Sequence, residues 1–300
     1  MTQPFDPVPG ACETLAPGLR RLLCPNPSPM TFRGTNCYLL GSDDLVVIDP
    51  GPDTPETRDA LRRAIGGARV EAILVTHAHL DHSPLARPLA AETGAPVLAF
   101  GPAEAGRSAV MQRLVAGGYA GGGEGIDAGF APDRCLIDGE TVETASGPIR
   151  ALHTPGHMGN HMCFGWGEAW FSGDLVMGWA TSLISPPDGD IAAFRASCER
   201  LAAEAPTVLY PGHGAPVTDP AARIAWLLAH RAERRAEVLA AIAGGQDTVE
   251  AITAAVYRDV VPALWTAAAR NVFAQLVELV EAGDVAAVPA LGPEARYRVV

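Results

Sequence analysis

Residues 76–82 read Thr-His-Ala-His-Leu-Asp-His, and they place four metal-binding types of side chain within six positions. They follow the apolar run 72–75, which is typical of a strand buried on both faces. Because alternate side chains of an extended segment point the same way, His77, His79 and Asp81 are expected to share one side. His82 lies where the chain stops being extended, so it can face a second point. Imidazole and carboxylate groups suit a divalent ion such as zinc, and this cluster can serve two ions.

The composition is that of a globular protein, with 48% hydrophobic and 19% charged residues. Three hundred residues suffice for one large domain, or for a large domain and a small one. All 22 basic residues are arginine, and the chain contains no lysine. Schiff-base chemistry on lysine and a Walker A nucleotide site are therefore excluded.

The net charge, the cysteines and the lack of a signal sequence limit which binding partners and which cellular location are expected. The net charge of −12 argues against tight binding to DNA or to nucleic acid in general. The six cysteines include no Cys-x-x-Cys pair, so we expect neither a structural zinc knuckle nor a disulfide framework. The sequence shows no signal peptide and no apolar run of membrane-spanning length, which predicts a cytoplasmic protein without a membrane partner.

Residues 19–218 alternate short apolar runs with turns and helical patterns, which is typical of an α/β fold. Asp190 is the expected N-cap of a helix over 191–205, and Ser83-Pro84 is expected to start a short helix ending near Glu92. Residues 101–133, which include Gly121-Gly122-Gly123, read as a partly helical insertion or a mobile flap. The expected strands cover 36–40, 45–48, 72–75, 96–100, 150–153, 161–164, 169–172 and 207–210.

The last third of the chain has a different pattern. Helices are expected over 221–243, 248–257 and 262–281, followed by strands over 284–288 and 295–300. Three helices and a hairpin are typical of a winged helix, so we place a domain boundary near residue 220. The prediction is a catalytic domain over residues 1–219 and a small winged-helix-like domain over 220–300.

Further ligand-type residues lie on sharp turns that follow expected strands. The sequence 153–161 reads His-Thr-Pro-Gly-His-Met-Gly-Asn-His, residues 171–174 read Phe-Ser-Gly-Asp, and residues 210–214 read Tyr-Pro-Gly-His-Gly. A turn of the same construction at 48–51 offers Asp49. Loops at strand ends are where α/β scaffolds tend to carry their chemistry.

These motifs, in this order, resemble those of the metallo-β-lactamase-fold hydrolase superfamily over residues 19–218. The resemblance implies an αββα sandwich and a pair of zinc ions. It implies that the first zinc is bound by His77, His79 and His157, and the second by Asp81, His82 and His213. It also implies that Asp174 bridges both ions and that Asp49 supports the ligand loop.

Residues 35–39 and 271–283 are similar to the subgroup that includes β-lactamase-like protein 2, in which endoribonuclease activity is reported for some members. The sequence departs from the common superfamily pattern at two places, and both affect the expected shape of the substrate pocket. Pro84-Leu85 stands where a Gly-Gly pair is common, and Met158 stands where threonine is common. Hydrolysis of β-lactams is not expected. The lactamases with the same histidine string lack the bridging aspartate that Asp174 provides, and secreted lactamases need a signal peptide.

The expected mechanism uses a hydroxide that bridges two zinc ions as the nucleophile, because zinc lowers the pKa of bound water from 15.7 to about 7. Asp81 and Asp174 are the expected catalytic carboxylates. His161 and Asn160 follow the ligand His157 closely, so they are candidates for substrate contact or proton donation.

Three functional classes stay open. The first is a dinuclear zinc hydrolase of an ester, thioester or related small molecule, and the acidic charge favours it. The second is a metal-dependent endoribonuclease acting on single-stranded RNA, although the expected helix 262–281 offers only Arg270 as a cation. The third is a redox or binding protein that uses the same ligands for iron. The winged helix is expected to pack, to shape the substrate site or to form a homodimer.

Overall fold

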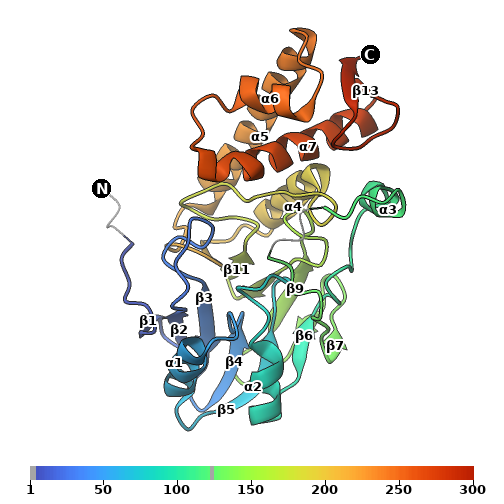
Figure 1. Ribbon diagram of the computed structural model, residues 1–300. Coiled ribbons are helices and arrows are strands. Elements are labelled where there is room, and N and C mark those ends of the chain that lie inside the picture. The colour runs from blue at the N-terminus through green and yellow to red at the C-terminus, as the bar shows by residue number, and fades with distance from the viewer. Residues whose placement is uncertain (1–4, 122–124) are drawn as a thin grey trace.

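The computed structural model describes residues 5–121 and 125–300. Among these residues, two β-sheets of seven and five strands form the centre of the larger part of the molecule, and a two-stranded hairpin lies at the C-terminal end. The helical C-terminal part covers one end of the sheets (Figure 1).

The first sheet has its strands in sequence order, and they become parallel from β4 onward. Its strands are β1 (Cys12–Ala16), β2 (Leu19–Leu23), β3 (Asn36–Leu40), β4 (Asp44–Ile48), β5 (Arg69–Leu74), β6 (Val97–Ala99) and β7 (Arg134–Cys135).

The second sheet has the order β12-β11-β10-β9-β8, and only its β11–β12 pair is parallel. Its strands are β8 (Thr141–Val142), β9 (Ile149–His153), β10 (Met162–Trp166), β11 (Ala169–Gly173) and β12 (Val208–Pro211).

Alternating side chains divide the core into layers. On β3, Leu39 packs towards helices α1 (Pro55–Ile65) and α2 (Ala86–Thr93), whereas Tyr38 and Leu40 pack between the sheets. Phe164 and Phe171 fill the same space from the second sheet. The outer face of that sheet packs against α4 (Ile191–Ala203) and the next helix of the chain, α5 (Pro220–Ala243). The layers are therefore α, β, β and α, which confirms the predicted fold class.

The C-terminal part contains the three predicted helices and the predicted hairpin. They are α5, α6 (Val249–Val256), a 3-10 turn η1 (Pro262–Leu264) with α7 (Trp265–Glu281), and strands β13 (Val285–Val288) and β14 (Arg296–Val299). This part has a hydrophobic core of its own, built around Ile252, Leu276 and Tyr297. The domain boundary near residue 220 stays a prediction.

The insertion 101–133 forms α3 (Ala109–Ala116), which packs on α7. Its Met111 and Leu114 contact Phe273 and Val277 in one buried cluster. Gly122 and Gly123, in the glycine run expected to be mobile, lie outside the described residues. Within the described residues, no helix combines the length and the hydropathy needed to cross a bilayer.

Two helices differ from the elements expected from the sequence. Helix α1 was not predicted from the sequence, although Thr54 caps it and Pro55 occupies its first turn, both usual signals of a helix start. Helix α2 begins at Ala86, after Ser83-Pro84, and Pro88 stands in its first turn, where a missing N–H breaks no helical hydrogen bond.

Candidate metal centre

The predicted ligands come together at one end of the sandwich, in loops that follow four strands. His77, His79, Asp81 and His82 follow β5, His157 follows β9, Asp174 follows β11, and His213 follows β12. Two of these loops are held by backbone contacts, since Thr35 forms an isolated bridge with His213, and Gly212 N donates to Gly173 O at 2.8 Å.

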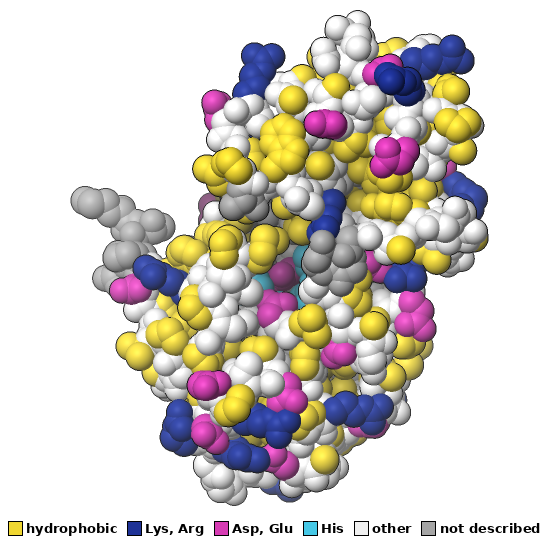
Figure 2. Space-filling model, viewed as in Figure 1, with side chains coloured by type: hydrophobic (Ala, Val, Ile, Leu, Met, Phe, Trp, Pro, Cys, Tyr) yellow, Lys and Arg dark blue, Asp and Glu magenta, His cyan; other side chains and the backbone are white. Residues whose placement is uncertain are grey.

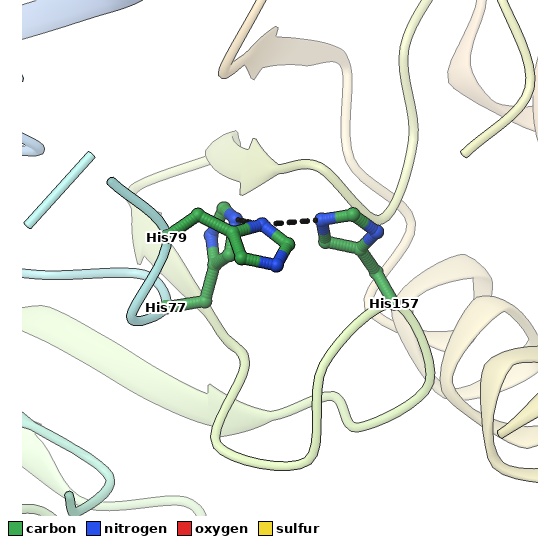
Figure 3. A group of neighbouring side chains, drawn as sticks. All are labelled: His77, His79 and His157. Carbon is green, nitrogen blue, oxygen red and sulfur yellow. Dashed lines mark hydrogen bonds between the residues drawn. The ribbon is translucent and has the colours of Figure 1, made fainter. Parts of the chain in front are cut away.

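The first group consists of His77, His79 and His157. His77 Nε2 lies 2.9 Å from His79 Nδ1, and His157 Nε2 lies 3.1 Å from the same atom. Figure 3 shows the three rings directed towards one another from two separate loops. Three ring nitrogens therefore meet at one point, although His157 is about 80 residues away in the chain.

The second group consists of Asp81, His82 and His213. His213 Nε2 lies 3.1 Å from Asp81 Oδ2, and His82 Nε2 lies 3.3 Å from both of those atoms. Asp81 is the most accessible member, with a quarter of its side chain exposed. The alternation that predicted a shared side for His77, His79 and Asp81 is broken here, because the chain turns at residues 79–82 and places Asp81 with the second group.

Asp174 lies between the two groups. Its Oδ1 is 3.6 Å from His82 Nε2, and its Oδ2 is 3.6 Å from His157 Nε2 and 3.4 Å from His213 Nε2. Asp174 therefore lies within 3.6 Å of histidines from both groups, and its bridging role stays a prediction. The structure thus brings together all seven predicted ligand residues.

Hydrogen bonds behind the rings fix which nitrogen faces the centre. His157 Nδ1 donates to Leu183 O at 2.7 Å, so its Nε2 carries the lone pair. Thr76 Oγ1 donates to Asp49 Oδ2 at 2.7 Å and can therefore accept from His77 Nδ1 at 2.9 Å.

The rings of the second group are held in the same way. His82 Nδ1 lies 2.9 Å from Asp49 Oδ2, and His213 Nδ1 lies 3.2 Å from Gly34 O. Asp49 was predicted to support the ligand loop, and the structure places it in contact with Thr76 and His82. The carbonyl groups of Leu183 and Gly34 could not be found from the sequence, because any residue type provides one.

Burial and neighbouring charges shift the histidine pKa values differently in the two groups. In the first, burial and the neighbouring imidazoles lower the pKa of His77 and His79, the latter to about 3, and burial also lowers the pKa of His157. Neutral imidazole is the form that binds metal. In the second group, burial opposes protonation of His213, but the carboxylates of Asp174 and Asp81 outweigh it and raise its pKa to about 10.

Several features of these residues fit bound divalent cations. A proton on His79 Nδ1 can satisfy only one of the two lone pairs that face it, whereas a cation satisfies all three nitrogens. Asp174 Oδ1 is buried and has no hydrogen-bond partner. A buried carboxylate oxygen without a partner is costly unless a positive charge compensates it. The mixture of imidazole and carboxylate ligands suits zinc and other borderline first-row metals.

His161 and Asn160, the candidates for substrate contact, are fully buried. They bond to the loops that carry the predicted ligands. His161 Nε2 accepts from the Asp174 backbone N–H at 3.2 Å, and its Nδ1 lies 2.9 Å from Thr154 Oγ1. Asn160 Oδ1 accepts from Ala78 N at 3.4 Å. In the described structure neither lines the cleft over the centre, so their catalytic role stays a prediction.

A cleft of about 560 Å³ opens over the metal centre. Its floor is formed by His79, Asp81, His157, Asp174 and His213. One wall is formed by Leu264 of η1 and by Thr266, Ala267 and Arg270 of α7. Figure 2 shows histidine and acidic side chains at the bottom of this hollow, with hydrophobic side chains along its rim. A side pocket of about 270 Å³ adjoins it and is lined mainly by hydrophobic residues, among them Met30, Met177, Trp179, Val260 and Leu264.

Comparison with known families identifies the fold. Residues 30–213 match the family model of the metallo-beta-lactamase superfamily. The chain belongs to this superfamily. Residues 248–290 match the beta-lactamase associated winged helix domain, which confirms the predicted class of the C-terminal part.

Curated proteins with similar sequences include a named thioesterase. The "Beta-lactamase-like protein 2 homolog" of Drosophila melanogaster is 28% identical over 92% of each chain. An "Atrochrysone carboxyl ACP thioesterase" of Aspergillus chevalieri is 30% identical over 91% of this chain and 83% of its own. The chain is therefore a metallo-beta-lactamase superfamily hydrolase.

A solved structure supports the same architecture. A metallo-beta-lactamase family protein of Thermus thermophilus is 26% identical, with a TM-score of 0.74 over 96% of this chain and all of that one. The match extends through the winged-helix domain of the present chain. None of these comparisons bears on RNA as a substrate or on a homodimer, and both stay predictions, as does the cytoplasmic location.

Proposed function

We propose that the protein is a zinc-dependent hydrolase of a small ester or thioester whose acyl group is apolar. His77, His79 and His157 would hold one ion, Asp81, His82 and His213 a second, and Asp174 would contact both. Zinc, when bound, supplies a hydroxide nucleophile at neutral pH and polarises the oxygen of the scissile bond.

The observation that carries this proposal is the pair of adjoining spaces over the centre. His157, Asp174 and Leu183 line both the open cleft and the apolar side pocket. An acyl group in the side pocket would therefore have its carbonyl carbon next to the histidine and carboxylate cluster. Burial of an apolar acyl chain contributes about 25 cal/mol per Å² to binding. The leaving group would then extend into the open cleft, on the other side of the predicted metal ligands.

Asp81 is the residue best placed to act on the attacking group. Its Oδ2 accepts from Thr35 Oγ1 at 3.2 Å, which fixes the carboxylate, and its side chain is exposed to the cleft. Asp81 also carries a lowered pKa, because the His82 and His213 rings outweigh the effect of burial. It therefore stays ionised and can accept a hydrogen bond from the nucleophile.

The leaving group would occupy the cleft beside α7. Arg270 is the one arginine among the described residues that line the cleft, so it adds positive charge on the side where an anionic leaving group would lie. The thioesterase named among the relatives supports a thioester as the scissile bond. Single-stranded RNA is the weaker alternative, because a net charge of −12 and a single lining arginine offer little attraction to a phosphate backbone.

The test is a metal analysis followed by a substrate screen. Zinc-loaded protein is assayed with acyl thioesters of increasing chain length, lactones, phosphodiesters and single-stranded RNA, with Asp81→Ala as the blank. We expect about two zinc ions per chain and turnover that rises with the apolar character of the acyl group. RNA cleavage that Asp81→Ala abolishes, together with no ester turnover, would overturn the assignment, and so would protein that takes up only traces of metal.

A further inference from the structure

Two polar side chains of the C-terminal part lie where this part meets the catalytic fold. Arg231 on α5 is buried, and Asn271 on α7 is half-buried. Arg231 is 3% exposed and donates to Ser182 O and, at 3.3 Å, to Asn271 Oδ1. Its guanidinium also lies 5.3 Å from the centre of the Phe194 ring. Ser182 and Phe194 both belong to the catalytic fold, so Arg231 connects the two parts of the molecule.

Asn271 acts on the same stretch of chain. Its Oδ1 accepts from the backbone N–H of Ile184 at 3.2 Å, and its Nδ2 donates to Ala267 O at 3.3 Å. The hydrogen bond within α7 fixes the direction of the amide, so the oxygen must face residue 184. Ile184 and Asn271 are 87 residues apart in the chain.

The segment 182–184, held in this way, contacts two of the predicted metal ligands. Leu183 O accepts from His157 Nδ1 at 2.7 Å, the hydrogen bond that directs His157 Nε2 towards the centre. Ser182 Oγ lies within hydrogen-bond distance of Asp174 O and of Leu175 O and can donate to either. One short segment thus orients the ring of a histidine of the first group and holds the backbone of the aspartate between the groups.

The cost of burying Arg231 argues for a role beyond packing. Within the described part of the chain no carboxylate pairs with Arg231, and its Nε has no hydrogen-bond partner. A buried cation without a counter-ion is expensive, and an apolar side chain of similar size would pack there at lower cost. Arginine instead offers several donors in a fixed plane, which suits it to hold a carbonyl group and an amide at once.

We propose that Arg231 and Asn271 are positioning residues for the metal centre, acting through residues 182–184 on His157 and Asp174. The winged-helix domain is then part of the machinery that sets metal affinity, in addition to forming a wall of the cleft. This inference rests on the proposed function in so far as both require metal at these ligands.

The test compares variants of full-length protein at Asn271. Asn271→Leu has a similar volume but no acceptor, whereas Asn271→Asp keeps an oxygen for the Ile184 N–H and for Arg231. Leu276→Ala, in the core of the same domain, is the control for a general loss of stability. Zinc affinity is measured by competition with a chromophoric chelator, and the ligand field by the visible spectrum of the cobalt(II) form.

We expect Asn271→Leu to bind zinc several-fold more weakly, up to about 10-fold. Loss of a partner bonded directly to a metal ligand costs about 10- to 100-fold, and Asn271 acts one contact further out. Its cobalt spectrum should change, while Asn271→Asp and Leu276→Ala should match the wild type. Should the leucine variant fail to fold, Asn271→Ala and Ser182→Ala test the same chain of contacts. Unchanged zinc affinity and spectrum in folded variants would overturn the inference alone, whereas wild-type protein without zinc would overturn the proposed function as well.

Discussion

At the scale of single residues, Asp49 connects the two ligand groups without reaching the cleft. Its Oδ1 accepts from Thr76 N at 2.7 Å, and its Oδ2 serves Thr76 Oγ1 and His82 Nδ1. Through Thr76 it also orients His77. Asp49 has a φ of +50°, a left-handed conformation that a residue other than glycine adopts at some cost. This conformational cost is found at a position where one carboxylate orients the rings of His77 and His82.

We predict that Asp49→Asn weakens zinc binding by about 10- to 100-fold. The amide keeps one acceptor oxygen, and its NH₂ group would face donors that now bond to a carboxylate oxygen. Equilibrium dialysis with metal analysis measures the change. Asp53→Asn is the matched control, because Asp53 pairs with Arg58 on the surface; an equal loss in both variants would contradict the role assigned to Asp49.

A second substitution addresses the carboxylate between the groups. Asp174→Asn should lower zinc affinity and turnover by more than the ~10- to 100-fold expected for a residue that only supports a ligand, because it removes charge shared by both groups. The pKa of Asp174 is lowered, since the rings of His213 and His82 outweigh the effect of burial, so the wild-type residue is ionised. Stoichiometry and steady-state kinetics measured on one preparation check this, and full activity of Asp174→Asn would contradict it.

At the scale of elements, the turns after the strands have to bring backbone very close to the ligands. Gly212, between β12 and His213, shows this best. A Cβ atom at this position would collide with Asp174 Oδ1 and would lie 2.7 Å from His82 Cε1. The glycine in the Pro-Gly-His turn is therefore required by the metal centre itself, since its own backbone dihedrals are open to other residues.

Gly212→Ala should consequently displace Asp174 or His82 and weaken zinc binding more than it destabilises the fold. Gly178→Ala provides the comparison, since a Cβ there would meet Val217 at an ordinary 3.5 Å. Chelator competition and thermal unfolding of both variants separate the two effects. The prediction fails if Gly212→Ala loses folding stability but binds zinc as well as Gly178→Ala does.

The elements also show what sequence patterns can predict. Strands such as β3 and β4 were predicted within one residue, because buried strands appear as short apolar runs bounded by turn residues. Strand β2 and the edge strands β1, β7 and β8 were not predicted. Two arginines interrupt the apolar pattern of β2, and the edge strands are short or partly exposed, so none of the four shows a continuous apolar run. The ligand residues were predictable from motif order, but the carbonyl groups that orient them depend on tertiary contacts and have no side-chain signal.

At the scale of the whole molecule, each ligand group draws on both sheets. His77 and His79 follow a strand of the first sheet and His157 a strand of the second, and the same holds for His82 and His213. The winged-helix domain then encloses the open side through α7. Sequence patterns predicted this domain as a separate unit, but they could not show that Asn271 reaches the segment beside His157, because that contact spans 87 residues.

Because the ligands link the two sheets, metal removal should lower the thermal stability of the whole molecule. Zinc present at a thousandfold excess over its Kd contributes about 4 kcal/mol, and each kcal/mol corresponds to a few degrees in Tm. Calorimetry of zinc-loaded and chelated protein measures this, with Asp81→Ala expected to show a smaller difference. Equal Tm values for the loaded and chelated wild type would argue against metal binding at these residues.

The hydrogen bonds from His157 to Leu183 O and from His213 to Gly34 O join groups of the polypeptide only, so no metal ion takes part in them. Small zinc-finger domains, in contrast, become ordered only when they take up their ion. A polypeptide that sets its own ligand directions can be emptied and refilled without unfolding. Portions of one purified preparation could then be loaded with cobalt, manganese or cadmium. Differences in turnover among these portions would report the chemistry of the ion alone.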